Sequence, residues 1–256
     1  ANLNLILEAS VRKDYDAIEK LTHGLQQVFQ AVKYSDFPVV AAPFGLVLGG
    51  GMEMIGGCDV RVVAAESYIG LVEVGVGLIP GAGGNLRLLS NLSKKMKTGI
   101  TGSLPLVQKA FETIGFAKVA TSADQAKSYG YLIPEDKIII NRDHILSEAK
   151  KTVLSMSDNY NPPEPESFKL PGVAGRIAVE VSVKGFVKAG KISEHDAFIA
   201  KKLAYVLTGG SKAGPLSTVD EQYLLDIERE SFLSLCAEVK TQDRIRYMLT
   251  KGKPLR

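Results

Sequence analysis

The chain has 256 residues, 45% of them hydrophobic, which is enough to bury a substantial core in one large or two smaller domains. Its net charge of +3 is too small to indicate nucleic-acid binding, and the sequence contains neither an apolar run of membrane-spanning length nor a visible signal peptide. Cys58 and Cys236 lack metal or redox spacing, so we expect buried, reduced side chains in a cytoplasmic protein.

The first third of the chain has the pattern of an α/β fold. Apolar residues recur at helical spacing over roughly 13–34, which predicts an amphipathic helix. Strands are predicted over Val39–Ala42 and Arg61–Ala65, with a helix beginning near Gly50 between them. This order indicates a βαβ unit with a parallel sheet. A ligand is therefore expected at the carboxyl ends of the strands, where residues 49–53 lie.

The sequence after Gly84 is mainly helical. The predicted helices are Leu104–Phe116, Ser122–Tyr129, His144–Met156, Ser193–Val206 and Val219–Cys236. Residues 159–166 contain too many prolines for a helix or a strand. This segment is the best candidate for a linker.

A glycine run and two glutamates carry the strongest chemical signal. Gly49, Gly50 and Gly51 precede Glu53, and Glu73 follows downstream. Glycines let a ligand approach the main chain and leave N–H groups free to bind an oxyanion, and carboxylates can transfer protons. The combination suits a reaction that develops negative charge on a carbonyl oxygen.

Each of these features also has an ordinary explanation when it occurs alone. Glycine clusters usually serve turns or close packing, and we expect only packing from Gly56 and Gly57. A glutamate near a helix start is most often a solvated residue favoured by the helix dipole, as at Glu66. The functional interpretation is favoured for the glycine run, Glu53 and Glu73 because several motifs occur together at sensible spacing.

Three segments, Phe37–Glu53, Tyr68–Glu73 and Ile79–Gly84, together resemble the signature of the enoyl-CoA hydratase (crotonase) superfamily. The resemblance implies an α/β fold with a crotonase-like ββα core on a parallel sheet. It also implies that Glu53 and Glu73 are the catalytic carboxylates and that the Gly50 amide belongs to the oxyanion hole. Gly49, Gly51 and Gly81 match positions next to the substrate. Isomerases of the family often keep one of the two glutamates, so the presence of both favours hydration.

The chain departs from the family pattern at two side chains and at its amino end. Val72 stands where proline is common and Asn85 where threonine is common, and neither change removes a reacting group. The second oxyanion amide of the family matches Ala1, before which the family has several further strands. We therefore expect the core to be truncated at its amino end, and the isolated piece to fold but to have little or no hydratase activity.

Downstream segments resemble the hydratase half of fusion proteins in which a 3-hydroxyacyl-CoA dehydrogenase precedes the hydratase. They are residues 190–196, 201–210, 221–235 and 251–256. The resemblance implies an α/β core over 1–95, a helical trimerisation-type region over 96–158 and a helical carboxyl-terminal extension over 159–256. It further implies a homo-oligomer and a possible fusion to a dehydrogenase domain, to which any NAD would belong.

The remaining residues do not indicate a metal, nucleotide or nucleophile site. His23, His144 and His195 have no second ligand at metal spacing and are expected at the surface. The segment 75–80 begins like a dinucleotide fingerprint, but Pro80 replaces its third glycine, which argues against an NAD-binding domain. The sequence has neither a Gly-x-Ser-x-Gly elbow nor a phosphate loop. We expect no cofactor beyond the coenzyme A of the substrate.

The reaction implied by the resemblance is addition of water to the 2,3 double bond of an enoyl-CoA, as in fatty-acid β-oxidation. The thioester oxygen would accept hydrogen bonds from the amides of Gly50 and Ala1, with the positive end of a helix near Gly81 adding to them. Glu53 and Glu73 would bind the water, and Glu73 would supply a proton to carbon 2. Two alternatives stay open: another crotonase reaction, either isomerisation or thioester hydrolysis, and a non-catalytic assembly module.

Overall fold

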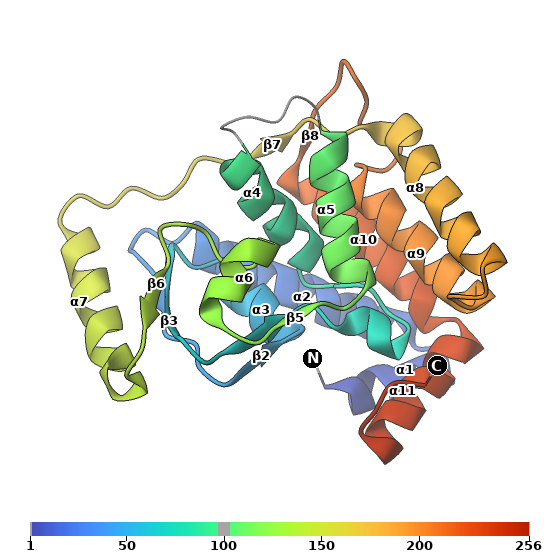
Figure 1. Ribbon diagram of the computed structural model, residues 1–256, viewed down its shortest axis with the longest axis horizontal. Coiled ribbons are helices and arrows are strands. Elements are labelled where there is room, and N and C mark those ends of the chain that lie inside the picture. Colours follow the sequence, from blue (N-terminus) through green and yellow to red (C-terminus); the bar gives the residue numbers. More distant parts are fainter. Residues whose placement is uncertain (1, 97–102, 256) are drawn as a thin grey trace.

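The computed structural model describes residues 2–96 and 103–255 (Figure 1). Short strands with α3 and α6 form an α/β part, and the long helices α5, α8, α9 and α10 lie beside it. Ala1, one of the two expected oxyanion donors, lies outside the described residues.

Two helices open the chain, each with a polar side chain at its start. In α1 (Leu3–Arg12), the Asn2 side chain accepts the Asn4 amide at 3.0 Å. In α2 (Tyr15–Lys33), Asp14 accepts the Ala17 amide at 3.1 Å. Such caps satisfy amides that have no acceptor inside the helix. The expected helix over 13–34 is confirmed by α2, whereas α1 was not predicted.

Six short strands form two separate three-stranded sheets. The first has the order β1 (Val40–Ala41), β3 (Val60–Ala64), β6 (Lys137–Ile139), and both of its pairings are parallel. The second has the order β2 (Leu46–Leu48), β4 (Tyr68–Gly70), β5 (Val119–Ala120), with β2 and β4 parallel and β5 antiparallel. The expected parallel pairing of the strands near 39–42 and 61–65 is confirmed, and the second sheet was not predicted.

The second sheet brings the two glutamates together. Leu48 at the end of β2 pairs with Gly70 at the end of β4, so the segments after both strands leave the same sheet edge. After β2, Gly49 turns the chain into α3 (Gly50–Ile55), which carries Glu53. After β4, the 3₁₀ helix η1 (Glu73–Val76) begins with Glu73 itself.

The rest of the chain is mainly helical, as the sequence pattern indicates. The helices are α4 (Gly84–Met96), α5 (Leu104–Gly115), α6 (Ala123–Tyr129), α7 (Ile145–Ser157), α8 (Gly172–Lys188), α9 (Glu194–Leu207), α10 (Glu221–Cys236) and α11 (Val239–Lys251), with the short 3₁₀ helix η2 (Arg142–His144) before α7. The five helices predicted after residue 100 are confirmed as α5, α6, α7, α9 and α10. Helices α8 and α11 were not predicted.

The irregular backbone predicted for the proline-rich segment is confirmed, and its role as a linker stays a prediction. Residues 159–166 have neither helix nor strand and run as a long extended segment from α7 to β7 (Ser167–Phe168) (Figure 1). Strand β7 then pairs antiparallel with β8 (Val219–Asp220), the residues where the sequence pattern predicted the start of α10. On the other side of the linker, α7 packs on β3 through a small cluster in which Ile145 and Ala149 meet Val62 and Ala64.

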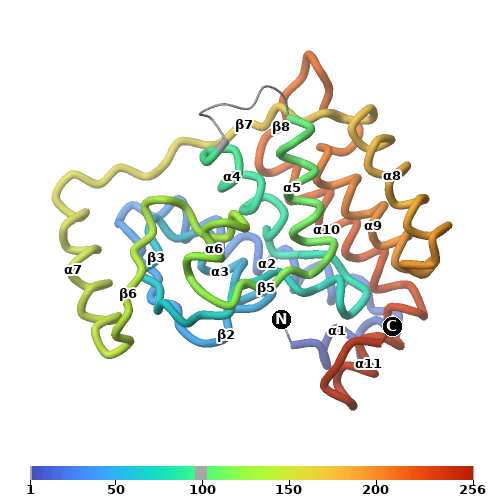
Figure 2. The backbone as a smooth tube through the Cα atoms, viewed as in Figure 1, coloured from blue at the N-terminus to red at the C-terminus, as the bar shows by residue number. Residues whose placement is uncertain are grey.

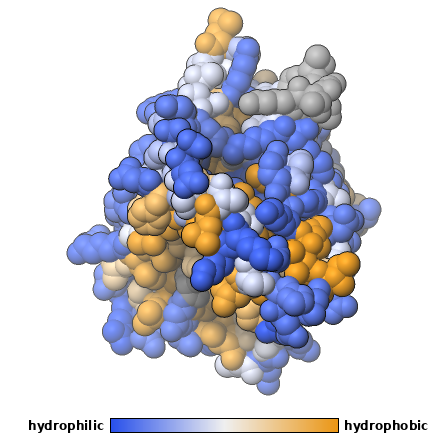
Figure 3. Space-filling view, turned by 90° about the vertical axis from the view of Figure 1, so that its left-hand side faces the viewer, coloured by the Kyte–Doolittle hydropathy of each residue, from blue (hydrophilic) through white to orange (hydrophobic). Residues whose placement is uncertain are grey.

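The surface that includes α7 is mixed in character (Figure 3). Patches of hydrophobic residues alternate there with hydrophilic ones. Three large apolar side chains in α7 or before it in the sequence are exposed: Ile140, Leu146 and Leu154. Single exposed apolar residues are common on soluble proteins.

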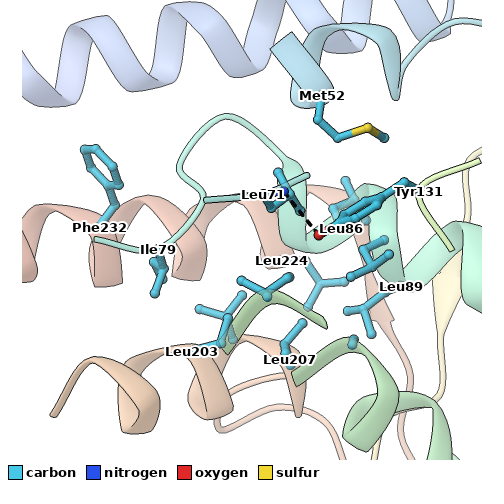
Figure 4. Close-up of a cluster of buried hydrophobic side chains, with 14 of the residues drawn as sticks. Met52, Leu71, Ile79, Leu86, Leu89, Tyr131, Leu203, Leu207, Leu224 and Phe232 are labelled. Atoms are coloured by element: carbon cyan, nitrogen blue, oxygen red, sulfur yellow. Dashed lines mark hydrogen bonds between the residues drawn. The ribbon is translucent and has the colours of Figure 1, made fainter. Parts of the chain in front are cut away.

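One large hydrophobic cluster joins the α/β part to the helices. It extends from Ile6 to Ile245, and burial of this apolar surface is the main stabilising contribution. Near the site, Met52 of α3, Leu71 and Tyr131 lie above leucines of α9 and α10 (Figure 4). The first and last helices, α1 and α11, lie side by side (Figure 2). The division at residues 95 and 158 stays a prediction, and the hydrophobic cluster includes residues from all three regions.

Candidate functional site

Glu53 lies on α3, and its side chain is held by main-chain amides at the start of α4. The side chain is 5% exposed, and its Oε1 accepts the Ala82 amide at 2.8 Å and the Gly84 amide at 3.1 Å. The neighbouring Met52 is buried in the hydrophobic cluster, so α3 cannot turn without losing that packing. Glu53 is therefore a fixed carboxylate with one oxygen already oriented.

Glu73 is packed against the glycine run. A Cβ atom at Gly49 would lie 2.8 Å from Glu73 Oε1, so only glycine leaves room for this carboxylate. The other oxygen, Oε2, is shielded from solvent and has no hydrogen-bond partner among the described residues. Just before it, the Leu71 amide donates to the Tyr131 hydroxyl at 3.2 Å, which fixes the end of the strand (Figure 4). Glu73 thus has a free acceptor inside a rigid frame.

The surroundings of the two carboxylates raise both of their pKa values. Burial raises the pKa of Glu73 to about 8, and the charge of Glu53 adds to the rise. Burial also raises the pKa of Glu53, against the lowering effect of the Ala82 and Gly84 amides. Two mutually repelling carboxylates with raised pKa values suit an exchange of protons near neutral pH.

The glycines have distinct local roles. Gly49 has a φ of +54°, and its amide donates to the Gly70 carbonyl at 2.8 Å, so it serves the turn and the sheet. Gly50 and Gly51 form the first turn of α3, whose amides have no intrahelical acceptor. A Cβ atom at Gly51 would meet only Val47, at 3.8 Å. The amides of Gly50 and Gly51 are thus donors of the kind that an oxyanion site requires.

Gly81 is in a different setting. It is buried, its carbonyl accepts the Gln26 side chain at 2.9 Å, and a Cβ atom would lie 2.8 Å from the ring of Phe232. Close packing against α10 explains the glycine, and contact of Gly81 with a substrate stays a prediction. Gly56 and Gly57 pack as expected, since Cβ atoms there would lie 3.0 Å from Arg87 and 2.8 Å from the Phe29 carbonyl.

The sequence analysis missed a third carboxylate, Glu228 on α10. This side chain is 1% exposed and accepts the Gly83 amide at 2.6 Å and the Asn85 amide at 3.1 Å. The Asn85 side chain also donates to it at 2.7 Å. The signal in the sequence was a glutamate at an apolar position of an amphipathic helix, flanked by Leu225 and Phe232.

The amides before α4 are therefore used within the protein. Helix α4 begins at Gly84 rather than near Gly81, and four successive amides donate alternately to Glu53 and Glu228. The positive end of this helix stabilises two buried carboxylates. Its direct action on a bound thioester, expected from the sequence, stays a prediction.

One histidine and the cysteines complete the sequence-based candidates. His23 and His144 are exposed as expected, but the surface position expected for His195 is wrong. Its ring is buried and lies 3.0 Å from Thr241 Oγ1, because α11 packs over the start of α9. Cys236 is buried and Cys58 half-buried, and burial raises the thiol pKa to about 12 and about 11. Such thiols are poor nucleophiles.

Within residues 2–96 and 103–255, no group of three or more His, Cys, Asp or Glu side chains is arranged to hold a metal ion. The helices in these two stretches are all too short or too polar to cross a membrane.

Known proteins resemble the chain in both sequence and fold. The family described as Enoyl-CoA hydratase/isomerase matches residues 6–124. A "Probable 3-hydroxyacyl-CoA dehydrogenase" of Bacillus subtilis (strain 168) is 45% identical over 100% of the chain and 32% of that protein. A "Putative fatty acid oxidation complex trifunctional enzyme" of Rickettsia felis is 28% identical over 96% of the chain and 31% of that protein. The chain thus spans about a third of the length of these two relatives.

A solved structure supports the fold. The crystal structure of an enoyl-CoA hydratase from Bacillus halodurans has a TM-score of 0.59 and 15% identity, and the match covers 96% of this chain and 74% of that one. At this identity the likeness concerns the fold alone, and it confirms the expected α/β core with its helical region.

Proposed function

Because the chain belongs to the enoyl-CoA hydratase/isomerase (crotonase) superfamily, we propose that it adds water to the 2,3 double bond of a 2-enoyl-CoA to give 3-hydroxyacyl-CoA. The observation that carries this proposal is the pair of carboxylates at one sheet edge. Glu53 is held by two amides, and Glu73 has an oxygen without a partner among the described residues. An isomerisation can proceed with one such group, whereas hydration adds both parts of a water molecule.

The proposed reaction divides the work between the two glutamates. Ionised Glu53 takes a proton from water as the water oxygen bonds to carbon 3. Protonated Glu73 gives its proton to carbon 2, as its raised pKa allows at neutral pH. The amides at the start of α3, above all that of Gly50, donate hydrogen bonds to the thioester oxygen and stabilise the charge that develops on it. The product leaves Glu53 protonated and Glu73 ionised, and proton exchange restores both.

The other roles expected from the sequence stay predictions. These are the oxyanion contact of Ala1, self-association, a dehydrogenase domain in the same polypeptide and a cytoplasmic location. The names of the two relatives that match most of the chain support a setting in fatty-acid oxidation.

A product assay on the intact protein tests the proposal. Crotonyl-CoA should be converted to 3-hydroxybutyryl-CoA, detected by chromatography, without release of free coenzyme A. A 3-enoyl-CoA supplied in parallel should be a poor substrate. Release of coenzyme A would indicate a thioesterase, efficient conversion of the 3-enoyl-CoA alone would indicate an isomerase, and no turnover of either would favour a non-catalytic module.

A further inference from the structure

Glu228 sits behind the site and accepts hydrogen bonds from the same short segment of main chain as Glu53. The amides of residues 82 to 85 donate alternately, with Ala82 and Gly84 to Glu53 and with Gly83 and Asn85 to Glu228. The two carboxylates thus grip the same four-residue loop from opposite sides. Moving one side of this loop must move the other, because adjacent peptide planes share each Cα atom.

Packing alone does not require a carboxylate at this position. Burying a charge costs several kcal/mol unless it is paired, and within the described part of the chain Glu228 forms no salt bridge. The adjacent Arg229 instead pairs with Asp226 at 2.9 Å and with Glu19 at 3.7 Å. An ordinary helix cap uses a single short polar side chain, whereas α4 receives two buried glutamates from α3 and α10.

Asn85 and Gln26 complete the surroundings of Glu228. The Asn85 side chain donates to Oε2 and to the Pro80 carbonyl, at 2.7 and 3.3 Å. The Gln26 side chain of α2 donates to the Gly81 carbonyl at 2.9 Å and reaches Glu228 Oε1 at 3.5 Å. Both ends of the loop from Pro80 to Asn85 are therefore tied to the group around Glu228.

We propose that Glu228 is a positioning residue for the reaction, which holds the loop 82–85 so that the Ala82 and Gly84 amides point at Glu53. Only the identity of the reaction in this inference rests on the proposed function. Fixing Oε1 of Glu53 leaves the second oxygen of that carboxylate to meet the water at a defined angle. A small displacement of the Glu53 carboxylate would lower the rate, although every reacting group would still be present.

Electrostatics supports the same role. Burial and then the charge of Glu53 raise the pKa of Glu228, and Glu228 in turn contributes to the raised pKa of Glu73. The charged groups around it are Glu53, Glu73 and Arg87, whose guanidinium pKa is lowered by its own burial and raised in part by Glu228. The pKa of Glu228 is raised to about 8, so its charge develops at the alkaline end of the pH range, and replacing it with an amide should lower the pKa of Glu73 there.

The test compares Glu228→Gln with Glu221→Gln in the intact protein. Both glutamates are buried acceptors on α10, but Glu221 binds Gln30, Lys33 and Tyr34 and is not bonded to the loop. With crotonyl-CoA, Glu228→Gln should lower kcat at least tenfold with KM changed less than threefold. The alkaline limb of its kcat–pH profile should move to lower pH. Glu221→Gln should lose stability at unchanged kcat.

Amide hydrogen exchange at Ala82 and Gly84 gives a readout that does not depend on the reaction. Exchange of both amides should accelerate in Glu228→Gln and remain slow in Glu221→Gln. If the wild-type protein does not hydrate crotonyl-CoA, the proposed function fails, while accelerated exchange would still support the positioning role. Unchanged exchange, or a folded Glu228→Gln variant with wild-type kcat and pH profile, would overturn the inference.

Discussion

Glu53 and Glu73 are chemically identical side chains in unlike settings. Two main-chain amides fix one oxygen of Glu53, whereas Glu73 rests against a glycine backbone and keeps an oxygen shielded from solvent without a partner in the described structure. Differences of this kind assign the roles of base and acid to two like groups.

Replacement of either carboxylate by its amide should stop proton transfer with little change in shape. We expect Glu53→Gln and Glu73→Gln each to lower the hydration rate by roughly 10²-fold or more. Steady-state kinetics with crotonyl-CoA measures the loss, and circular dichroism checks the fold. Near-normal turnover in either variant would remove that residue from the mechanism.

Gly49 should tolerate no side chain. In Gly49→Ala, the new methyl group meets Glu73 Oε1, and the backbone at a φ of +54° and a ψ of −121° is a conformation that L-residues rarely adopt. We expect a fall in kcat together with a fall in the unfolding free energy. Gly24→Ala is the matched control, because nothing lies within 4 Å of a Cβ atom there and alanine favours helix α2. Equal kinetics in the two variants would contradict this assignment.

Helices α2 and α10 are joined by a buried ionic group. Lys33 lies 2.6 Å from Glu221 and 2.9 Å from Glu166, the last residue of the proline-rich linker. Burial alone would raise the pKa of Glu221, but hydrogen bonds from Gln30, Lys33 and Tyr34 outweigh it and lower the pKa to about 2. The linker is therefore irregular in its backbone but fixed at its end.

Removal of Lys33 should destabilise this junction more than an exposed ion pair would. Lys33→Met leaves two carboxylates facing each other, so we expect a loss of roughly 3–5 kcal/mol in unfolding free energy. Lys151→Met breaks a pair with Glu148 in which the lysine is 72% exposed, and should cost much less, because solvent screens an exposed ion pair. Urea unfolding of both variants measures the difference, and similar small losses would show that the junction adds little.

Elements with strong local patterns could be predicted, and those that depend on distant contacts could not. Helix α2 has a clear apolar face, so its sequence alone indicates it. Strands β2 and β4 have three residues each, too few for an alternation to be visible. Helix α8 carries apolar residues on its exposed side as well, including Val173, Ile177 and Val181, which hides its periodicity.

The site shows the same division. The motif spacing predicts Glu53, Glu73 and the glycine run as site residues, and these residues are close in sequence to the strands that position them. Glu228 could not be found in this way, since its partner Asn85 is 143 residues away. His195 was misplaced for a similar reason, because its burial depends on α11.

At the scale of the whole molecule, the buried carboxylates should make stability depend on pH. The pKa of Glu73 rises from 4.5 to about 8 on folding, so the folded state binds the proton more tightly. Its contribution to stability is complete below about pH 4.5 and is lost as the pH rises through 8. Glu221 acts in the opposite sense, since its lowered pKa contributes stability that is lost as the pH falls from 4.5 toward 2.

The Glu73→Gln variant isolates the first effect. We expect its unfolding free energy to exceed that of the wild type at pH 8 by more than at pH 5, because glutamine cannot ionise. Urea unfolding at the two pH values provides the comparison. A difference between the proteins that does not vary with pH would show that Glu73 has an ordinary pKa. Gain of stability with loss of activity is a known trade-off at functional sites.

The hydrogen bonds between the loop before α4 and Glu228 on α10 also affect the order in which the site can form during synthesis. Glu228 follows Gly83 by 145 residues. A ribosome that adds 5–20 residues per second therefore synthesises the loop roughly 7–30 s before it synthesises Glu228. During that interval Glu53 and its two amides exist without the group that closes the loop from behind. We therefore expect a nascent chain halted before α10 to fold its strands and α2 but to lack a finished site. The order of synthesis thus places completion of the candidate site after α10 has been made.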